Sequence, residues 1–130
     1  MSEKNVKNIK WMKRAIHLAS LGDGKTSPNP MVGAVILDKN GNIISEGFHF
    51  KAGMPHAEAM AFNNLKKDAT GGSMYVNLEP CCHQGKTPPC VDKVISSGIK
   101  DVYISIQDPD KRVSGRGIKK LKEAGIQVHL

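Results

Sequence analysis

The sequence predicts an α/β fold: a five-stranded mixed sheet between two layers of helices, giving a three-layer α/β/α domain. Segments with helical periodicity alternate with short apolar runs in the order α-β-β-α-β-α-β-α-β. The turn Lys39–Asn42 separates the first two runs and predicts an antiparallel hairpin. Helices between the later strands imply parallel crossover connections, so those strands are expected to run parallel.

The first half of the chain is expected to contain two helices and the hairpin. An apolar stripe at helical spacing predicts the first helix over Asn5–Leu21, which Gly22 ends. The hairpin strands are expected at Met31–Leu37 and Ile43–His49, and the second helix at His56–Lys67, ended by Gly71 and Gly72. The stripe of the first helix consists of Ile9, Met12, Ile16 and Ala19.

The second half predicts three strands separated by two helices, each bounded by a turn or a glycine. Gly98 and Gly125 are expected to end the two helices. The strands are expected at Ser73–Leu78, Asp101–Ile106 and Ile126–His129, and the helices at Cys90–Ser97 and Gly117–Ala124.

Length and composition limit the class of protein. With 130 residues, 39% of them hydrophobic, the chain is expected to form a single domain, 1–130, with one core. No apolar run approaches the roughly 20 residues that a membrane helix needs, and the N-terminus has no apolar signal core. A cytoplasmic protein is therefore expected, in which three cysteines indicate metal binding or reactivity rather than disulfides.

The net charge of +7 is concentrated at the two ends of the chain. Residues 1–14 hold five basic residues and one acid, and residues 110–130 hold six and two. The intervening residues 15–109 hold eight basic and nine acidic residues. This distribution favours solvated basic helix faces over a groove for nucleic acid.

Four residues form the constellation that carries chemistry: His56, Glu58, Cys81 and Cys90. One imidazole and two thiolates are preferred zinc ligands, and three protein ligands leave a fourth position open for water. His56 and Glu58 can approach one metal ion only from the first turn of a helix, because residues two apart diverge within a helix. Pro55 directly before His56 suits such a helix start.

Glu58 has the chemistry of a proton shuttle. A carboxylate beside a metal-activated water can take its proton and pass it to a leaving amine. His-x-Glu followed by Pro-Cys-x-x-Cys is the pattern of zinc nucleobase deaminases. Here eight residues separate Cys81 from Cys90, where that pattern has two.

Four segments make the chain similar to a known family. They contain the runs SPNPMVGA from Ser27, GMPHAE from Gly53, LEPCCHQGKTPPC from Leu78, and Asp108-Pro109 leading to GRGI from Gly115. With these segments the chain resembles the deaminase domain of bacterial riboflavin biosynthesis proteins. The stretch from Cys81 to Cys90 is the most specific, because it accounts for the long cysteine spacing.

The resemblance implies a cytidine-deaminase-like fold and zinc-dependent hydrolytic deamination of a diaminopyrimidine ribosylamino 5′-phosphate in riboflavin biosynthesis. It implies one zinc ion on His56, Cys81 and Cys90, with Glu58 as the proton shuttle. The family's Asp-Pro-Asn-Pro tetrapeptide differs here, because Asp110-Lys111 takes the place of its last two residues. The substrate contacts that the resemblance implies are Asn29, His49 and Lys86, with Asp108, Asp110 and Arg116 as further candidates.

Three further features near these motifs are Glu79, Cys82 and the segment Ser114–Gly117. Glu79 is interpreted as a structural hydrogen-bond acceptor, and Cys82 as a packing or pocket-lining residue. The segment Ser114–Gly117 is either a loop or a site where backbone amides and Arg116 meet an anion.

Two other functions remain open from the residues. The chain could be a zinc deaminase of another nucleobase, of a nucleotide or of a tRNA adenosine. It could also be a non-catalytic domain with a structural zinc, in which Cys82 or His83 supplies a fourth ligand. A redox role for Cys81 and Cys82 is disfavoured, because a disulfide between adjacent residues is strained.

The resemblance also implies the surroundings of the enzyme. The partners expected are the phosphorylated pyrimidine, other copies of the chain in a homo-oligomer, and a separate reductase for the next step. No membrane partner is expected. Because the family's deaminase is often fused to a reductase, a chain of 130 residues is expected to carry out only the deamination, either as a free-standing enzyme or as a piece of a longer protein.

Overall fold

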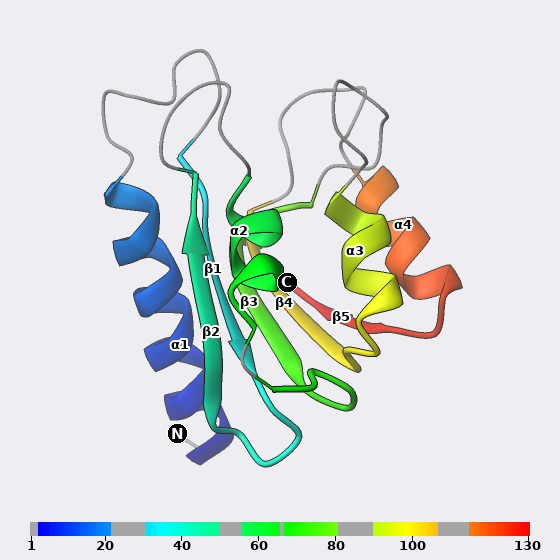
Figure 1. Cartoon of the computed structure of the whole chain (residues 1–130), viewed down its shortest axis with the longest axis horizontal. Helices are drawn as coiled ribbons and strands as arrows, with labels where there is room; N and C mark the ends of the chain where they lie inside the picture. Colours follow the sequence, from blue (N-terminus) through cyan, green and yellow to red (C-terminus); the bar gives the residue numbers. More distant parts are fainter. Residues whose placement is uncertain (1–2, 22–30, 50–55, 66, 81–89, 107–114) are drawn as a thin grey trace.

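The computed structural model describes residues 3–21, 31–49, 56–65, 67–80, 90–106 and 115–130. Its elements follow the predicted order, with the strands in the spatial order β2-β1-β3-β4-β5 (Figure 1). The helices are α1 (Glu3–Ser20), α2 (Ala57–Asn63), α3 (Cys90–Ser96) and α4 (Arg116–Glu123). The strands are β1 (Gly33–Leu37), β2 (Ile43–Phe48), β3 (Ser73–Leu78), β4 (Asp101–Ile106) and β5 (Gln127–His129).

The sheet is mixed, as predicted. Strand β1 pairs antiparallel with both β2 and β3, while β3–β4 and β4–β5 are parallel pairs. The turn between β1 and β2 places Gly41 in the left-handed region, at a φ of 85°, which explains the glycine there. The predicted hairpin and the parallel later strands are therefore confirmed.

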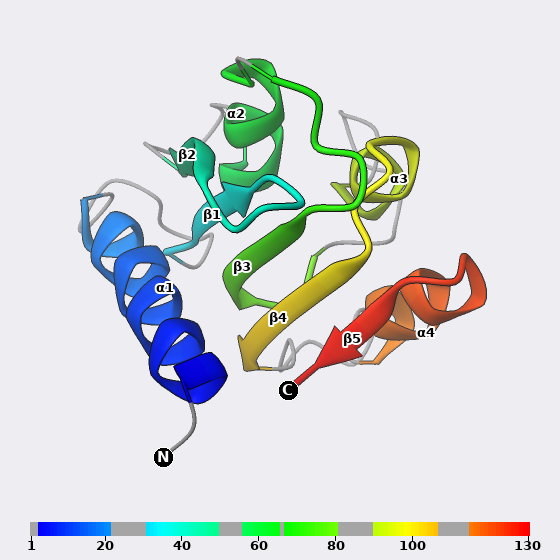
Figure 2. The same ribbon diagram turned by 90° about the horizontal axis from the view of Figure 1, so that it is seen from below.

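Helices cover both faces of the sheet. Helix α1 lies on one side, and α2 and α3 lie on the other (Figure 2). Helix α4 packs through Ile118 and Leu121 into the same core cluster as α2 and α3. The three-layer α/β/α prediction is confirmed, and none of the helices within the described ranges is long and apolar enough to cross a membrane.

The central strand β1 is buried along its whole length because both of its faces meet helices. Ala34 and Ile36 point into the cluster under α2 and α3, while Val35 and Leu37 join the cluster under α1. This two-sided burial explains why β1 reads as a continuous apolar run rather than an alternating one.

Helix α1 forms where it was predicted but turns a different face to the sheet. Ala15, Leu18 and Ala19 are buried, whereas Ile9 is 43% and Ile16 49% exposed. The cause is a close approach to β1, since a Cβ on Gly33 would lie 2.1 Å from the carbonyl oxygen of Ala15. Small residues rather than isoleucines therefore form the contact. The predicted buried stripe is wrong at Ile9 and Ile16, whereas Ala19 is buried and Met12 packs against the core.

Helix α2 is shorter than predicted. It ends at Asn63 instead of continuing to Lys67, and Asn64 is its C-cap residue. Two successive asparagines have low helix propensity, which explains the early end. The other boundaries agree with the prediction to within two residues.

Helix α2 packs closely against β2. A Cβ on Gly47 would lie 2.4 Å from the carbonyl oxygen of Ala57 and 2.6 Å from the amide nitrogen of Ala61. Only glycine permits this approach. The first turn of α2, with its functional residues, is therefore held directly against the sheet.

Candidate active site

The predicted site residues within the described ranges gather at one edge of the sheet. His49 follows β2, His56 caps α2, Glu79 follows β3 and Cys90 begins α3. In Figure 1 the helices α3 and α4 begin at the edge where β3 and β4 end. The carboxyl ends of parallel strands are the usual location of ligand sites in α/β sheets.

Two of the three predicted zinc ligands are in contact. Cys90 Sγ lies 3.4 Å from His56 Nδ1, although the two residues are 34 apart in the sequence. Tetrahedral zinc with ordinary bonds to sulfur and nitrogen holds these two atoms about 3.5 Å apart. Because Cys90 is also buried, its thiol and the imidazole fit a shared zinc ion.

Glu58 lies in the first turn of α2, as the zinc interpretation requires. His56 is the N-cap residue, with extended backbone at φ −65° and ψ 164°. This geometry places His56 just outside the helix and Glu58 within its first turn, so both side chains can face the same end of α2. Glu58 is only 4% exposed, so its carboxylate is buried at the start of α2.

His49 extends the cluster beside His56. The two imidazole rings meet edge to face, with centroids 5.2 Å apart and an interplanar angle of 87°. His49 is 2% exposed, and its backbone N–H donates to the carbonyl oxygen of Val32 at 3.0 Å. A buried imidazole next to the candidate metal ligands is consistent with substrate binding, which stays a prediction.

The remaining candidates lie outside the described residues. Within the described part of the chain, no group of three or more His, Cys, Asp or Glu side chains forms a complete metal site. The third predicted zinc ligand, Cys81, lies outside that part of the chain. The candidates outside the described ranges are Asn29, Cys81, Cys82, His83, Lys86, Asp108 and Asp110.

Glu79 is a hydrogen-bond acceptor, as predicted, and its donors are the amides at the start of α4. Its carboxylate accepts from the backbone N–H groups of Gly115, Gly117 and Ile118. The amides of Gly115, Gly117 and Ile118 therefore bind the protein's own carboxylate, and an anion site at Ser114–Gly117 stays untested. Arg116 is exposed, and its role in substrate binding stays a prediction.

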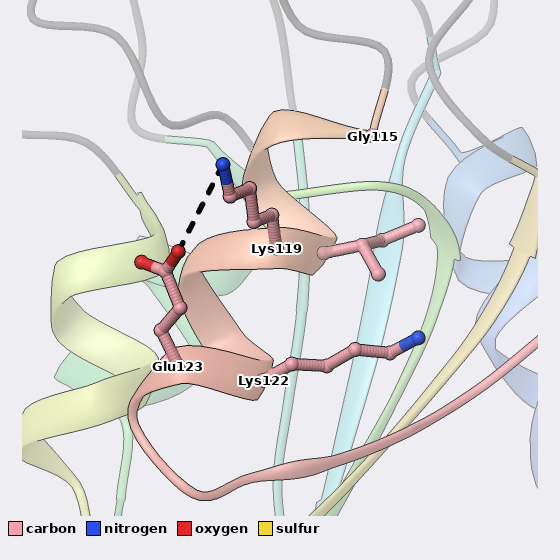
Figure 3. Close-up of a pocket in the computed structure, with 5 residues that line it drawn as sticks. Gly115, Lys119, Lys122 and Glu123 are labelled. Atoms are coloured by element: carbon pink, nitrogen blue, oxygen red, sulfur yellow. Dashed lines mark ion pairs between the residues drawn. The ribbon is translucent and has the colours of Figure 1, made fainter.

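A shallow hollow on the outer surface of α4 is separate from this cluster (Figure 3). Lys119 and Glu123 form an ion pair of 4.0 Å on its rim, and both side chains are well exposed. Exposed pairs of this kind contribute little to stability. The lining residues include none of the predicted zinc ligands: they are Gly115, Ile118, Lys119, Lys122 and Glu123.

Comparison with known families identifies the class to which the protein belongs. The model of the cytidine and deoxycytidylate deaminase zinc-binding region matches residues 5–106. The chain belongs to this family of zinc-binding deaminases.

Relatives with high sequence identity show which kind of deaminase this chain is similar to. A diaminohydroxyphosphoribosylamino-pyrimidine deaminase from Buchnera aphidicola is 51% identical over 120 residues, which are 92% of this chain and 81% of that protein. The chain therefore belongs to the diaminohydroxyphosphoribosylamino-pyrimidine deaminases. The riboflavin biosynthesis protein RibD of Actinobacillus pleuropneumoniae is 50% identical over 98% of this chain. The chain spans about a third of the length of such RibD proteins, since the match covers 34% of that relative.

Solved structures show the same fold. A diaminohydroxyphosphoribosylaminopyrimidine deaminase/5-amino-6-(5-phosphoribosylamino)uracil reductase from Thermotoga maritima has a TM-score of 0.92 and 48% identity. The match covers 98% of this chain and 37% of that one. The dCMP deaminase of cyanophage S-TIM5 has a TM-score of 0.74 over 99% of this chain and 98% of that one. Its 21% identity shows a shared fold alone. The predicted cytidine-deaminase-like fold is confirmed.

Proposed function

We propose that this chain is a zinc-dependent hydrolase that removes an amino group from 2,5-diamino-6-ribosylamino-4(3H)-pyrimidinone 5′-phosphate and releases ammonia. The observation that carries the proposal is the 3.4 Å contact between His56 Nδ1 and Cys90 Sγ beside the helix turn that bears the buried Glu58. This set of side chains provides a thiolate, an imidazole and a carboxylate in one place. Together they suit activation of water and transfer of its proton.

The zinc ion is proposed to be held by His56, Cys90 and Cys81, one ion per chain. When bound, zinc supplies Lewis-acid activation of a water molecule. The carboxylate of Glu58 would take a proton from the water that attacks the ring carbon carrying the amino group. Glu58 then delivers the proton to the departing nitrogen, so the carbon–nitrogen bond breaks as ammonia leaves.

The identity of the substrate is supported by the relatives, one of which is named a diaminohydroxyphosphoribosylamino-pyrimidine deaminase. His49 is proposed to hydrogen-bond the substrate, because it is buried against His56 at the candidate metal centre. Asn29 is proposed to contact the pyrimidine and Lys86 the phosphate. Arg116, Asp108 and Asp110 are further proposed contacts.

Three features of the cellular setting are also proposed. Residues 1–130 are proposed to form one deaminase domain, to associate with further copies of the chain, and to pass the product to a reductase that acts next. The reductase proposal is supported by the name of the Thermotoga maritima protein, which joins the two activities.

Ammonia release tests the function directly. The zinc-loaded protein is expected to release ammonia from the diaminopyrimidine ribosylamino 5′-phosphate at a far higher kcat/KM than from cytidine, CMP or guanine. The control is the Glu58→Gln protein, which keeps the side-chain volume and removes the base. Preference for another nucleobase or nucleotide would overturn the substrate. Absence of turnover with every substrate, in a zinc-loaded protein, would favour a structural zinc domain.

A further inference from the structure

Glu79 joins the end of β3 to the start of α4. Its backbone N–H donates to the carbonyl oxygen of Ile106 at 3.0 Å, which extends the β3–β4 pairing past the last residue of β3. Its side chain is 3% exposed and turns toward α4. Glu79 therefore hydrogen-bonds to the sheet through its backbone and to α4 through its side chain.

The carboxylate is engaged by three backbone amides. Oε1 accepts from Gly115 N at 3.0 Å, and Oε2 accepts from Gly117 N at 2.9 Å and from Ile118 N at 3.2 Å. Hydrogen bonds to an ionised acceptor are stronger than neutral ones, and a negative charge is favourable at a helix N-terminus. Glu79 is therefore a strong link between the two elements.

The backbone of the residue after Glu79 is also in close contact with α4. A Cβ on Gly117 would lie 2.3 Å from the carbonyl oxygen of Pro80, and Pro80 is itself fully buried. Pro80 is the residue directly before Cys81, the proposed third zinc ligand. The first turn of α4 thus lies against the chain segment that leads into the metal centre.

We propose that Glu79 is a positioning residue for the deaminase site, holding the N-terminus of α4 against the Glu79–Pro80 segment and so fixing the chain directly before Cys81, the proposed zinc ligand. This inference rests on the proposed function, because it takes Cys81 as a zinc ligand. The carboxylate acts through the backbone that it fixes and not on the substrate. Zinc retention and the order of the first turn of α4 are consequently coupled.

Two substitutions disturb this link in different ways. Glu79→Gln replaces one acceptor oxygen with an NH2 group, which faces a backbone N–H. Gly117→Ala keeps the charge of the carboxylate but places a methyl group 2.3 Å from the carbonyl oxygen of Pro80 and 3.2 Å from Glu79 Oε2. Groups that support metal ligands typically alter metal affinity by 10- to 100-fold when mutated. We expect both proteins to release zinc to a chelator about 10-fold faster than wild type, with a lower kcat.

Asp38→Asn is the matched control. Asp38 Oδ1 also accepts two backbone N–H groups, those of Asn40 and Asn42, each at 2.9 Å. It lies in the hairpin turn after β1, at the end of the sheet away from Glu79. The same carboxylate-to-amide change at Asp38 should leave zinc release and kcat at wild-type values.

Hydrogen exchange of the wild-type protein tests the coupling without a variant. Coupling between two sites is reciprocal, so removal of zinc should speed exchange of the amides of Gly117 and Ile118. The amides of Asn40 and Asn42 should exchange at the same rate with and without zinc. In the Glu79→Gln protein the effect of zinc on the α4 amides should disappear.

Wild-type rates of zinc release in both Glu79→Gln and Gly117→Ala would overturn the inference. So would exchange of the α4 amides that is independent of zinc. If Glu79→Gln fails to fold, the Gly117→Ala protein and the wild-type exchange decide the question. A wild-type protein that binds no zinc or releases no ammonia would instead contradict the proposed function, whatever the variants do.

Discussion

Two buried glutamates show how the surroundings of a carboxylate determine its role. Glu58 is 4% and Glu79 3% exposed, so burial alone does not distinguish them. Both oxygens of Glu79 accept backbone amides of α4, which commits that side chain to a structural link. Glu58 instead lies in the first turn of α2, two residues after His56, the position proposed for the proton shuttle.

Replacing Glu58 with Gln should remove turnover and keep the metal. General acid–base catalysis contributes about 10²- to 10⁴-fold, so kcat/KM is expected to fall by that factor. The zinc content, measured by mass spectrometry of the purified protein, should stay at the wild-type value because Glu58 is not a proposed ligand. Near-normal activity of the zinc-loaded variant would contradict the role assigned to Glu58.

Cysteine substitutions distinguish a catalytic zinc site with three protein ligands from a structural site with four. Cys90→Ser is expected to lose most of its zinc, because it removes a thiolate next to His56 Nδ1. Cys82→Ser is the comparison and is expected to keep wild-type zinc content and activity. Loss of zinc from both proteins would indicate a fourth protein ligand and a non-catalytic metal.

At the scale of elements, glycines set how closely the helices approach the sheet. Gly33 lets α1 pack closely on β1, and Gly47 lets α2 pack closely on β2. Gly117 lets the first turn of α4 approach the carbonyl oxygen of Pro80. Each of these contacts is too short for a Cβ. The helix α2 carries His56 and Glu58 at its start, so its distance from β2 also determines where these side chains lie.

Gly47→Ala should therefore affect both stability and metal binding. Its Cβ would meet the Ala57 carbonyl oxygen at 2.4 Å, and relief of such overpacking typically costs about 1–3 kcal/mol. Denaturant unfolding should show this loss, and zinc affinity should weaken because His56 moves with the helix. Gly41→Asn is the control, since a Cβ there meets nothing within 4 Å and Asn tolerates a positive φ. Unaltered zinc affinity in Gly47→Ala would show that α2 can shift without moving the ligand.

The whole molecule is built around a sheet that is covered differently on its two faces. On the α1 side, the rings of Tyr75 and Tyr103 stack with centroids 4.4 Å apart, and Tyr103 stacks in turn on His129. The Tyr75 hydroxyl donates to the side-chain oxygen of Asn8 on α1. Burial raises the pKa of both tyrosines above the usual value of 10.

These raised pKa values predict a loss of stability at alkaline pH. Folding favours the neutral phenols, so their contribution is fully present below pH 10 and is lost as the pH rises through the higher pKa values of the folded state. The free energy of unfolding should therefore fall between pH 10 and 11. In Tyr75→Phe this fall should be smaller when each protein is compared with itself at pH 8. An equal fall in both proteins would show that Tyr75 does not control it.

The sequence predicted the fold to a large extent because its signals are local. The order of elements, the hairpin turn at Gly41 and the helix end at Gly125 follow from periodicity and from positions that need a positive φ. The face of α1 could not be predicted in this way, because it depends on the contact of Ala15 with Gly33 across the chain. The end of α2 also differs from the prediction, because Asn63 and Asn64 end the helix before Gly71 and Gly72 are reached.

The sequence by itself indicated which chemistry this chain carries, because the residue types and spacing of His56, Glu58 and the cysteines are typical of a zinc deaminase. Only the tertiary structure decided which of these groups meet. It brought Cys90 Sγ to 3.4 Å from His56 Nδ1, and it paired the α4 amides with the carboxylate of Glu79. The physical reason is that residue type and spacing are local properties, whereas a contact between distant segments depends on how closely helices and sheet pack.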